Sequence, residues 1–271
     1  MGGVSINELT TYRWSFEEDV THYAEAGVQA IGVWRQKLAD FGEEKGAELL
    51  KESGLAVSNL LWAGGFTGSD GRSHQESIED AAEAIELASE LGTDCLVVYS
   101  GGRGGHTQNH ARRLLLGALK ELAPVARDRG VYLAIEPMHV SCACDWTYLT
   151  DIDDTLEILD AVTGDQLKLV FDTYHLAQQA DILDRLDELV SRTAIVHVGD
   201  CRTIAEGEQN RCLLGEGGIP LAEILSRYLA AGYQGYFDVE LLGEDIELAN
   251  YDQLVRESND TCQQLLQTAC L

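Results

Sequence analysis

The stretch "LKLVFDTYHLA" (residues 167–177) begins as an apolar run and then presents Asp172 and His175 on either side of a tyrosine. The β-branched and aromatic residues of its first half are typical of a buried strand. Burying a carboxylate and an imidazole at the end of such a strand is costly unless they have partners or a function. We therefore interpret this segment as one strand of a barrel, with its carboxyl end forming part of a metal site.

The same pattern, an apolar run followed by a helical segment, recurs along the chain. Eight such runs are found, at residues 3–7, 28–34, 56–62, 94–100, 131–137, 167–172, 193–200 and 235–242. Near-continuous apolar strands indicate a parallel sheet covered on both faces. Eight strand–helix units predict a (β/α)8 TIM barrel, with a single domain over residues 1–271. A doubly wound sheet is the alternative, but no "GxGxxG" or "GxxxxGK" follows the first run.

The composition excludes some classes of function. The 271 residues are 45% hydrophobic, and the net charge is −27 from 46 acidic and 19 basic residues, of which only five are Lys. Such a field repels phosphate backbones and argues against nucleic-acid binding. An acidic, Lys-poor surface suits a salt-rich cytoplasm, where charges are strongly screened. We therefore hypothesise a halophilic source; an ordinary acidic bacterial enzyme is the alternative.

Other sequence features suggest a cytoplasmic protein with no membrane contact. No apolar run reaches the roughly 20 residues that a membrane-spanning helix needs. The first residues, "MGGVSINELT", lack the pattern of a secretory signal. The seven cysteines are scattered and odd in number, which favours reduced thiols over a disulfide framework.

Chargeable residues end or follow four successive apolar runs. These are Glu136, Asp172, His197 and Glu240. Taken singly, each is more often a cap, an ion-pair partner or a core histidine. Together they predict a metal site, because the active sites of TIM barrels lie at the carboxyl ends of the strands. This oxygen-rich set favours one Mn²⁺ or Mg²⁺ ion, with Co²⁺ or Zn²⁺ as alternatives through the imidazole. Glu136 and Glu240, on strands that are not neighbours, are expected to flank a substrate.

Four motifs, "AIEPMH", "FDTYHL", "HVGDCR…RCLLGEGGIPL" and "FDVELLG", resemble the sugar-phosphate isomerase/epimerase superfamily of xylose-isomerase-like TIM barrels. The resemblance implies that the four residues above hold one divalent metal and that Glu136 and Glu240 are the catalytic acid/base pair. It also implies substrate-binding residues. These are His175, either Arg202 or Arg211, and, from their positions after strands, Trp62 and His106.

The resemblance implies an isomerase or epimerase of a sugar or polyol, which moves a proton α to a carbonyl through an enediolate. A metal-dependent lyase acting on an inosose or 3-dehydroshikimate is the nearest alternative, because it shares the first half of the mechanism. An endonuclease IV-like repair enzyme is disfavoured, since "SINEL", "GVWRQ" and "NLLWAGG" lack the extra histidine ligands. A non-catalytic barrel would need a missing ligand. Superfamily members commonly form homo-oligomers, and phosphorylation of the substrate stays open.

Overall fold

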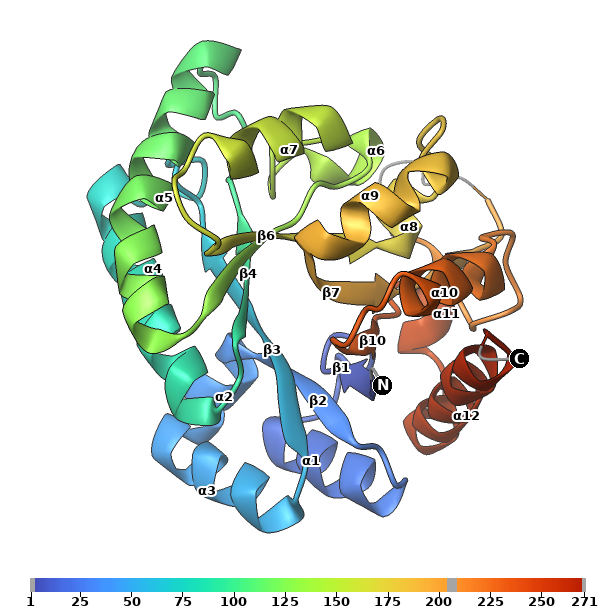
Figure 1. The fold of residues 1–271 in the computed structure, drawn as a ribbon. Coiled ribbons are helices and arrows are strands. Elements are labelled where there is room, and N and C mark those ends of the chain that lie inside the picture. Colours follow the sequence, from blue (N-terminus) through green and yellow to red (C-terminus); the bar gives the residue numbers. More distant parts are fainter. Residues whose placement is uncertain (1–2, 204–208, 270–271) are drawn as a thin grey trace.

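The computed structural model describes residues 3–203 and 209–269. Within them, eight parallel strands close into a barrel in the order β1-β10-β7-β6-β5-β4-β3-β2 (Figure 1). The predicted TIM barrel is therefore confirmed. Its strands are β1 (Val4–Asn7), β2 (Ala30–Trp34), β3 (Ala56–Gly64), β4 (Cys95–Tyr99), β5 (Tyr132–Ile135), β6 (Leu167–Asp172), β7 (Thr193–Val198) and β10 (Phe237–Val239).

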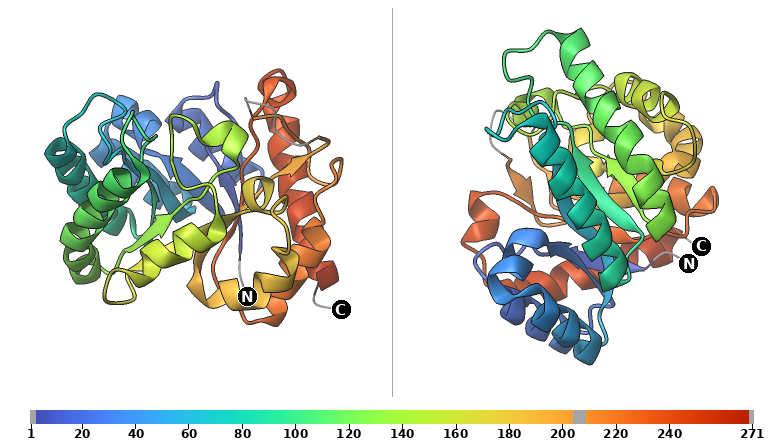
Figure 2. Two further views of the ribbon diagram at one scale, coloured as in Figure 1. Left: turned by 90° about the horizontal axis from the view of Figure 1, so that it is seen from above. Right: turned by 90° about the vertical axis from the view of Figure 1, so that its left-hand side faces the viewer.

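Helices form the layer around the barrel, and α4 and α5 pack side by side against it (Figure 2). The longer helices are α1 (Phe16–Glu25), α2 (Arg35–Phe41), α3 (Glu43–Ser53), α4 (His74–Leu91), α5 (Gln108–Arg129), α7 (Ile152–Asp160), α10 (Leu221–Ala230) and α12 (Tyr251–Ala269). Single-turn helices are α6 (Val140–Ala143), α8 (Thr173–Leu176), α9 (Leu186–Leu189) and α11 (Glu244–Glu247). In the described part of the chain, no helix combines the length and apolarity needed to cross a bilayer.

Local sequence signals fix the helix ends. Ser15 and Glu18 form a capping box at the start of α1, and an equivalent box starts α4. An N-cap of this kind contributes about 1 kcal/mol to helix stability. Gly130 ends α5 at a φ of 70°, in the left-handed region that glycine enters without a steric penalty. These signals explain why the predicted strand–helix alternation is recovered.

One predicted helix is interrupted. The sequence "ILDRLDELVS" (182–191) has a helical pattern, but α9 is only four residues long and lies between two 3₁₀ turns, Leu183–Arg185 and Val190–Arg192. The carbonyl of Leu189 accepts a hydrogen bond at 2.9 Å from Oγ1 of Thr193, the first residue of β7. The backbone N–H of Thr193 donates instead to the carbonyl of Val190, in the tighter 3₁₀ pattern, so the helix ends there and β7 begins.

A small hairpin lies between β7 and α10. It pairs β8 (Asp200–Cys201) with β9 (Arg211–Cys212) in antiparallel fashion. The Asp200 carboxylate holds the loop that follows, because it accepts hydrogen bonds from the backbone N–H groups of Gly215 and Gly217 at 2.9 and 3.0 Å. The hairpin therefore has a fixed place beside the carboxyl ends of the barrel strands, and it places Arg211 there.

Candidate active site

Acidic residues and one histidine meet at the carboxyl ends of four strands. Asp172 is the last residue of β6 and pairs in register with His197 on β7. Glu136 directly follows β5, and Glu240 directly follows β10. Each of Glu136, Asp172 and His197 offers one possible ligand atom, and these three atoms lie within 4.8 Å of one another. All three residues are buried. Because all barrel strands are parallel, these ends lie on the same face of the barrel.

Glu240 lies beside this group rather than within it. Its Oε2 atom is 3.0 Å from Nδ1 of His197, and its Oε1 atom is 3.0 Å from Nη2 of Arg211. The structure thus brings together all four residues predicted as metal ligands. One oxygen of Glu240 is, however, engaged by the guanidinium of Arg211, one of the two arginines that the resemblance assigned to the substrate.

Arg211 reaches the site from the hairpin and is fully buried. It donates from Nη2 to Oδ2 of Asp172 at 2.9 Å and from Nη1 to the carbonyl of Glu240 at 2.9 Å. Its guanidinium also lies over the ring of Tyr174, 4.6 Å from the centroid. Burial alone would lower the pKa of Arg211, but the charges of Asp172 and Glu240 raise it. Arg211 therefore stays charged and offsets part of the negative charge of the site.

The two glutamates differ in their environment. Burial raises the pKa of Glu136 above its ordinary value. Burial would do the same to Glu240, but the positive charges of Arg211 and His197 lower the pKa of Glu240 to about 2. Burial lowers the pKa of His197, yet the neighbouring Glu240 and Glu136 raise it well above its ordinary value. The site thus favours a positive charge at the position that these carboxylates share.

The donor set fits a divalent metal ion. Among the residues that the structure describes, neither ring nitrogen of His197 has a hydrogen-bond partner. Its Nδ1 atom lies 3.0 Å from Oε2 of Glu240 and 3.6 Å from Oε1 of Glu136, but neither contact has hydrogen-bond geometry. Unpartnered buried polar groups are costly, and carboxylate oxygens with one imidazole are ligands that Mn²⁺, Co²⁺ or Zn²⁺ accept. Glu136, Asp172 and His197 could hold such an ion, with Glu240 beside them.

His175 is a second buried histidine with free ring nitrogens. It lies in α8, whose N-terminus is capped by Asp172 through hydrogen bonds from the N–H groups of Tyr174 and His175. His175 is only 1% exposed, and its two ring nitrogens have no partner in residues 3–203 and 209–269. Burial lowers the pKa of His175 to about 4. A neutral imidazole is therefore available to hydrogen-bond a ligand.

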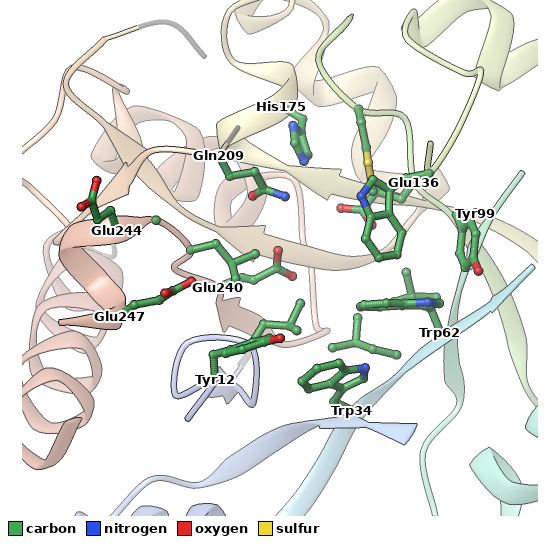
Figure 3. A pocket seen from close by; sticks show the side chains of 17 residues that line it. Tyr12, Trp34, Trp62, Tyr99, Glu136, His175, Gln209, Glu240, Glu244 and Glu247 are labelled. Carbon is green, nitrogen blue, oxygen red and sulfur yellow. The ribbon is translucent and has the colours of Figure 1, made fainter. Parts of the chain in front are cut away.

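These residues line a cavity of about 560 Å³ at the end of the barrel (Figure 3). Glu136, Glu240 and His175 project into it. The opposite wall is aromatic: the ring centroids of Trp34 and Trp62 are 6.1 Å apart. The further aromatic residues that line the cavity are Tyr12, Tyr99 and Trp146. Apolar rings next to a few polar groups are typical of a small-molecule site.

The other predicted substrate residues lie in different places. Trp62 lines the cavity, whereas His106 is not among its lining residues and contacts the carbonyl of Thr67 through Nε2 at 3.1 Å. Arg202, with 56% of its side chain exposed, pairs with Glu216 and lies 3.7 Å from Asp245. Of the two arginines that the resemblance left open, Arg211 is therefore the one in contact with Asp172 and Glu240.

Several residues that line the cavity were not predicted from the sequence. They are Tyr12, Trp34, Tyr99, Trp146, Gln209, Glu244 and Glu247. A usable signal existed for Trp34, because it ends β2 at the barrel face where Trp62 lies on β3. Trp146 and Gln209 lie in irregular segments, where periodicity carries no information.

The model of the family described as xylose isomerase-like TIM barrel matches residues 20–264. The chain belongs to this family. An inosose isomerase of Halalkalibacterium halodurans is 26% identical over 213 residues, covering 76% of this chain and 73% of that protein. A D-psicose 3-epimerase of Enterocloster bolteae is 25% identical over 118 residues, covering 43% and 36%. A 3-dehydroshikimate dehydratase of Pseudomonas aeruginosa is 26% identical over 180 residues, covering 64% of this chain and 27% of that protein.

Solved structures share the fold over nearly the whole chain. A Sinorhizobium meliloti 1021 protein has a TM-score of 0.89 at 28% identity, with 97% of this chain and 98% of that chain covered. The IOLI protein, solved with a bound zinc atom, has a TM-score of 0.84 at 20% identity, with 98% and 99% covered. The curated relatives named above are an isomerase, an epimerase and a dehydratase.

Proposed function

We propose that this chain is a divalent-metal-dependent isomerase or epimerase of a sugar or related polyol, which moves a proton α to a carbonyl. The observation that carries the proposal is the pair Glu136 and Glu240. Both line one cavity; Glu136 belongs to the group that could hold a metal, and Glu240 lies beside that group. The names of the relatives, an inosose isomerase and a psicose 3-epimerase among them, support the same class of reaction.

Two carboxylates in one cavity can exchange a proton with a substrate carbon. One of them removes the proton next to the carbonyl, which gives an enediolate, and the other returns a proton. Return to the opposite face gives an epimer, and return to the neighbouring carbon gives an aldose–ketose isomer. The neutral His175 imidazole is placed to hydrogen-bond a substrate hydroxyl and orient it. The aromatic wall excludes water from the non-reacting side of the substrate.

A bound divalent ion supplies Lewis-acid polarisation of the carbonyl and stabilises negative charge on its oxygen. Glu136, Asp172 and His197 are the residues that would hold it. Mn²⁺ is our first choice because carboxylate oxygens dominate the donor set. Arg211 keeps Asp172 and Glu240 in fixed orientations, because it hydrogen-bonds both residues.

The lyase alternative requires a group that protonates a departing β-hydroxyl. His175 is the residue best placed for this, because its buried ring nitrogens have no hydrogen-bond partner among the described residues. Dehydration would be recognised directly, because it creates a conjugated enone with new ultraviolet absorbance, whereas epimerisation does not.

The proposal is tested by incubating the Mn²⁺-loaded protein in D₂O with ketoses, inososes and 3-dehydroshikimate. Deuterium uptake at one carbon of a ketose or inosose, followed by NMR without new ultraviolet absorbance, is the expected result. Glu136→Gln should abolish the exchange, while its urea unfolding curve in EDTA stays close to that of the EDTA-treated parent protein. Exchange at the parental rate in this variant would remove Glu136 from the mechanism, and enone formation would replace the isomerase with the lyase.

A further inference from the structure

The charged residues of the cavity are all of one sign. Of the described residues that line it, four are glutamates and none is Lys or Arg. Glu136 and Glu240 belong to the proposed reaction centre. Glu244 and Glu247 lie on α11, at the end of the cavity away from Tyr99 (Figure 3). Both are exposed, and within residues 3–203 and 209–269 neither forms an ion pair.

Nearby arginines are already engaged by other carboxylates. Arg202 pairs with Glu216 and lies near Asp245, while Arg211 is buried beneath the cavity on Asp172 and Glu240. Residues 204–208, which lie outside the described part of the chain, read "IAEGE" and contain neither Lys nor Arg. A substrate with a phosphate or carboxylate at its far end would therefore meet like charges, and no free cation lines the described cavity.

The other lining groups suit hydroxyls and C–H faces. His175 is almost fully buried, points into the cavity and has no hydrogen-bond partner among the described residues. The rings of Trp62 and Trp146 meet edge to face, with centroids 4.9 Å apart, and give the wall an apolar surface. Polar groups that are neutral, next to aromatic rings, recognise an uncharged polyol.

Resting on the proposed function, we propose that this cavity selects sugars by charge. Its substrate is a neutral or amine-bearing sugar, and sugars with a phosphate or carboxylate at the far end are rejected. Glu244 and Glu247 determine this specificity. Each like-charge contact at about 4 Å weakens binding roughly fivefold even at the dielectric constant of water, and an opposite charge strengthens it by a similar factor.

The test compares three ligands that differ only at carbon 6, namely a ketohexose, its 6-phosphate and its 6-amino-6-deoxy analogue. Binding is read by tryptophan fluorescence of the Mn²⁺-loaded protein at low salt. Three of the four tryptophans of the sequence, Trp34, Trp62 and Trp146, line the cavity. We expect the phosphate to bind at least roughly tenfold more weakly than the neutral sugar, and the amine several-fold more tightly. A phosphate that binds as well as the neutral sugar would overturn the proposal.

Substitutions identify the residues responsible. The double variant Glu244→Gln/Glu247→Gln should reduce both differences to within about threefold. The control Glu83→Gln/Glu90→Gln removes the same charge from exposed positions on α4 that do not line the cavity. It should bind the three ligands with the same relative affinities as the parent protein. If the ratio of the affinities for the neutral sugar and its 6-phosphate were unchanged in Glu244→Gln/Glu247→Gln, the charge selection could not be assigned to α11. The order of the three ligand affinities, measured by fluorescence, does not depend on turnover. A protein that binds the ligands selectively but does not exchange deuterium would therefore refute the proposed reaction, and the proposed charge selection would still hold.

Discussion

The buried side chains of Arg211 and Asp172 are joined by a 2.9 Å hydrogen bond between Nη2 and Oδ2, which ties the β8–β9 hairpin to the end of β6. The same Nη2 atom lies 3.0 Å from Oε1 of Glu240. One guanidinium thus holds two carboxylates of the site in place. An ion pair of this kind does little for stability relative to apolar packing, but removing one partner leaves a buried charge without compensation.

Arg211→Met should therefore destabilise the protein by about 3–5 kcal/mol, because Asp172 and Glu240 lose their shared cation. Urea unfolding at pH 7 in the presence of EDTA measures this loss. The matched control is Arg202→Met, whose exposed pair with Glu216 is weakened by the surrounding water, so this variant should unfold at nearly the parental urea concentration. Equal losses in the two variants would mean that Arg211 is not the structural cation of the site.

The different positions of Arg202 and Arg211 could not be predicted from the sequence. Arg202 and Arg211 lie nine positions apart in one polar stretch, and the motif predicts a substrate-binding arginine without saying which. Their roles separate only through the hairpin, in which Cys201 pairs in register with Arg211. Two-residue strands are too short to leave a periodic signal, so this choice depends on the three-dimensional structure.

The barrel and the acidic strand ends could be predicted from the sequence, because both follow from apolar runs that stop at a chargeable residue. Glu136 and Glu240 are examples, each directly after a strand. The cavity wall could not be predicted in this way. Trp146 comes from an irregular segment after α6, and Glu244 from a single-turn helix, so their approach to the strand ends is a tertiary contact without a local pattern.

Metal binding should stabilise the folded protein measurably. Adding Mn²⁺ to EDTA-treated protein at about 100 times the dissociation constant should increase the free energy of unfolding by about 2.7 kcal/mol. For a chain of this size that corresponds to a rise in Tm of roughly 5 °C. Scanning calorimetry detects the rise, and elemental analysis after desalting should give about one ion per chain.

Glu136→Gln should remove most of this increase, because the amide is a far weaker ligand than the carboxylate. Glu83→Gln, which alters an exposed position on α4, should retain it. If Mn²⁺, Mg²⁺, Co²⁺ and Zn²⁺ all failed to raise the Tm of the parent protein, the predicted metal centre would be wrong.

His175 should make the metal-free protein less stable in mild acid. Burial lowers its pKa to about 4, whereas an unfolded chain has a histidine pKa near 6.5. Between these values the unfolded state binds the extra proton, so stability falls as the pH falls from about 6.5 to 4, by about 3 kcal/mol in all. In urea unfolding with EDTA, the free-energy difference between the parent protein and His175→Gln should be constant above pH 7 and should decrease below it. A difference that stayed constant down to pH 4.5 would show that His175 is already protonated, or hydrated, in the fold.

The net charge of −27 should make the thermal stability of the protein depend on salt concentration. Self-repulsion among the exposed carboxylates should lower stability at low ionic strength, and screening should relieve it as the Debye length falls from about 30 Å at 0.01 M to about 3 Å at 1 M. We therefore expect the Tm to rise between about 0.01 and 1 M KCl, most steeply at the low end. A variant in which several exposed glutamates of α3 and α4 are changed to Gln should start from a higher Tm and show a shallower rise, because it has less charge to screen. A Tm that is insensitive to KCl in both proteins would mean that the acidic surface is not a salt adaptation, and the halophilic hypothesis would fail.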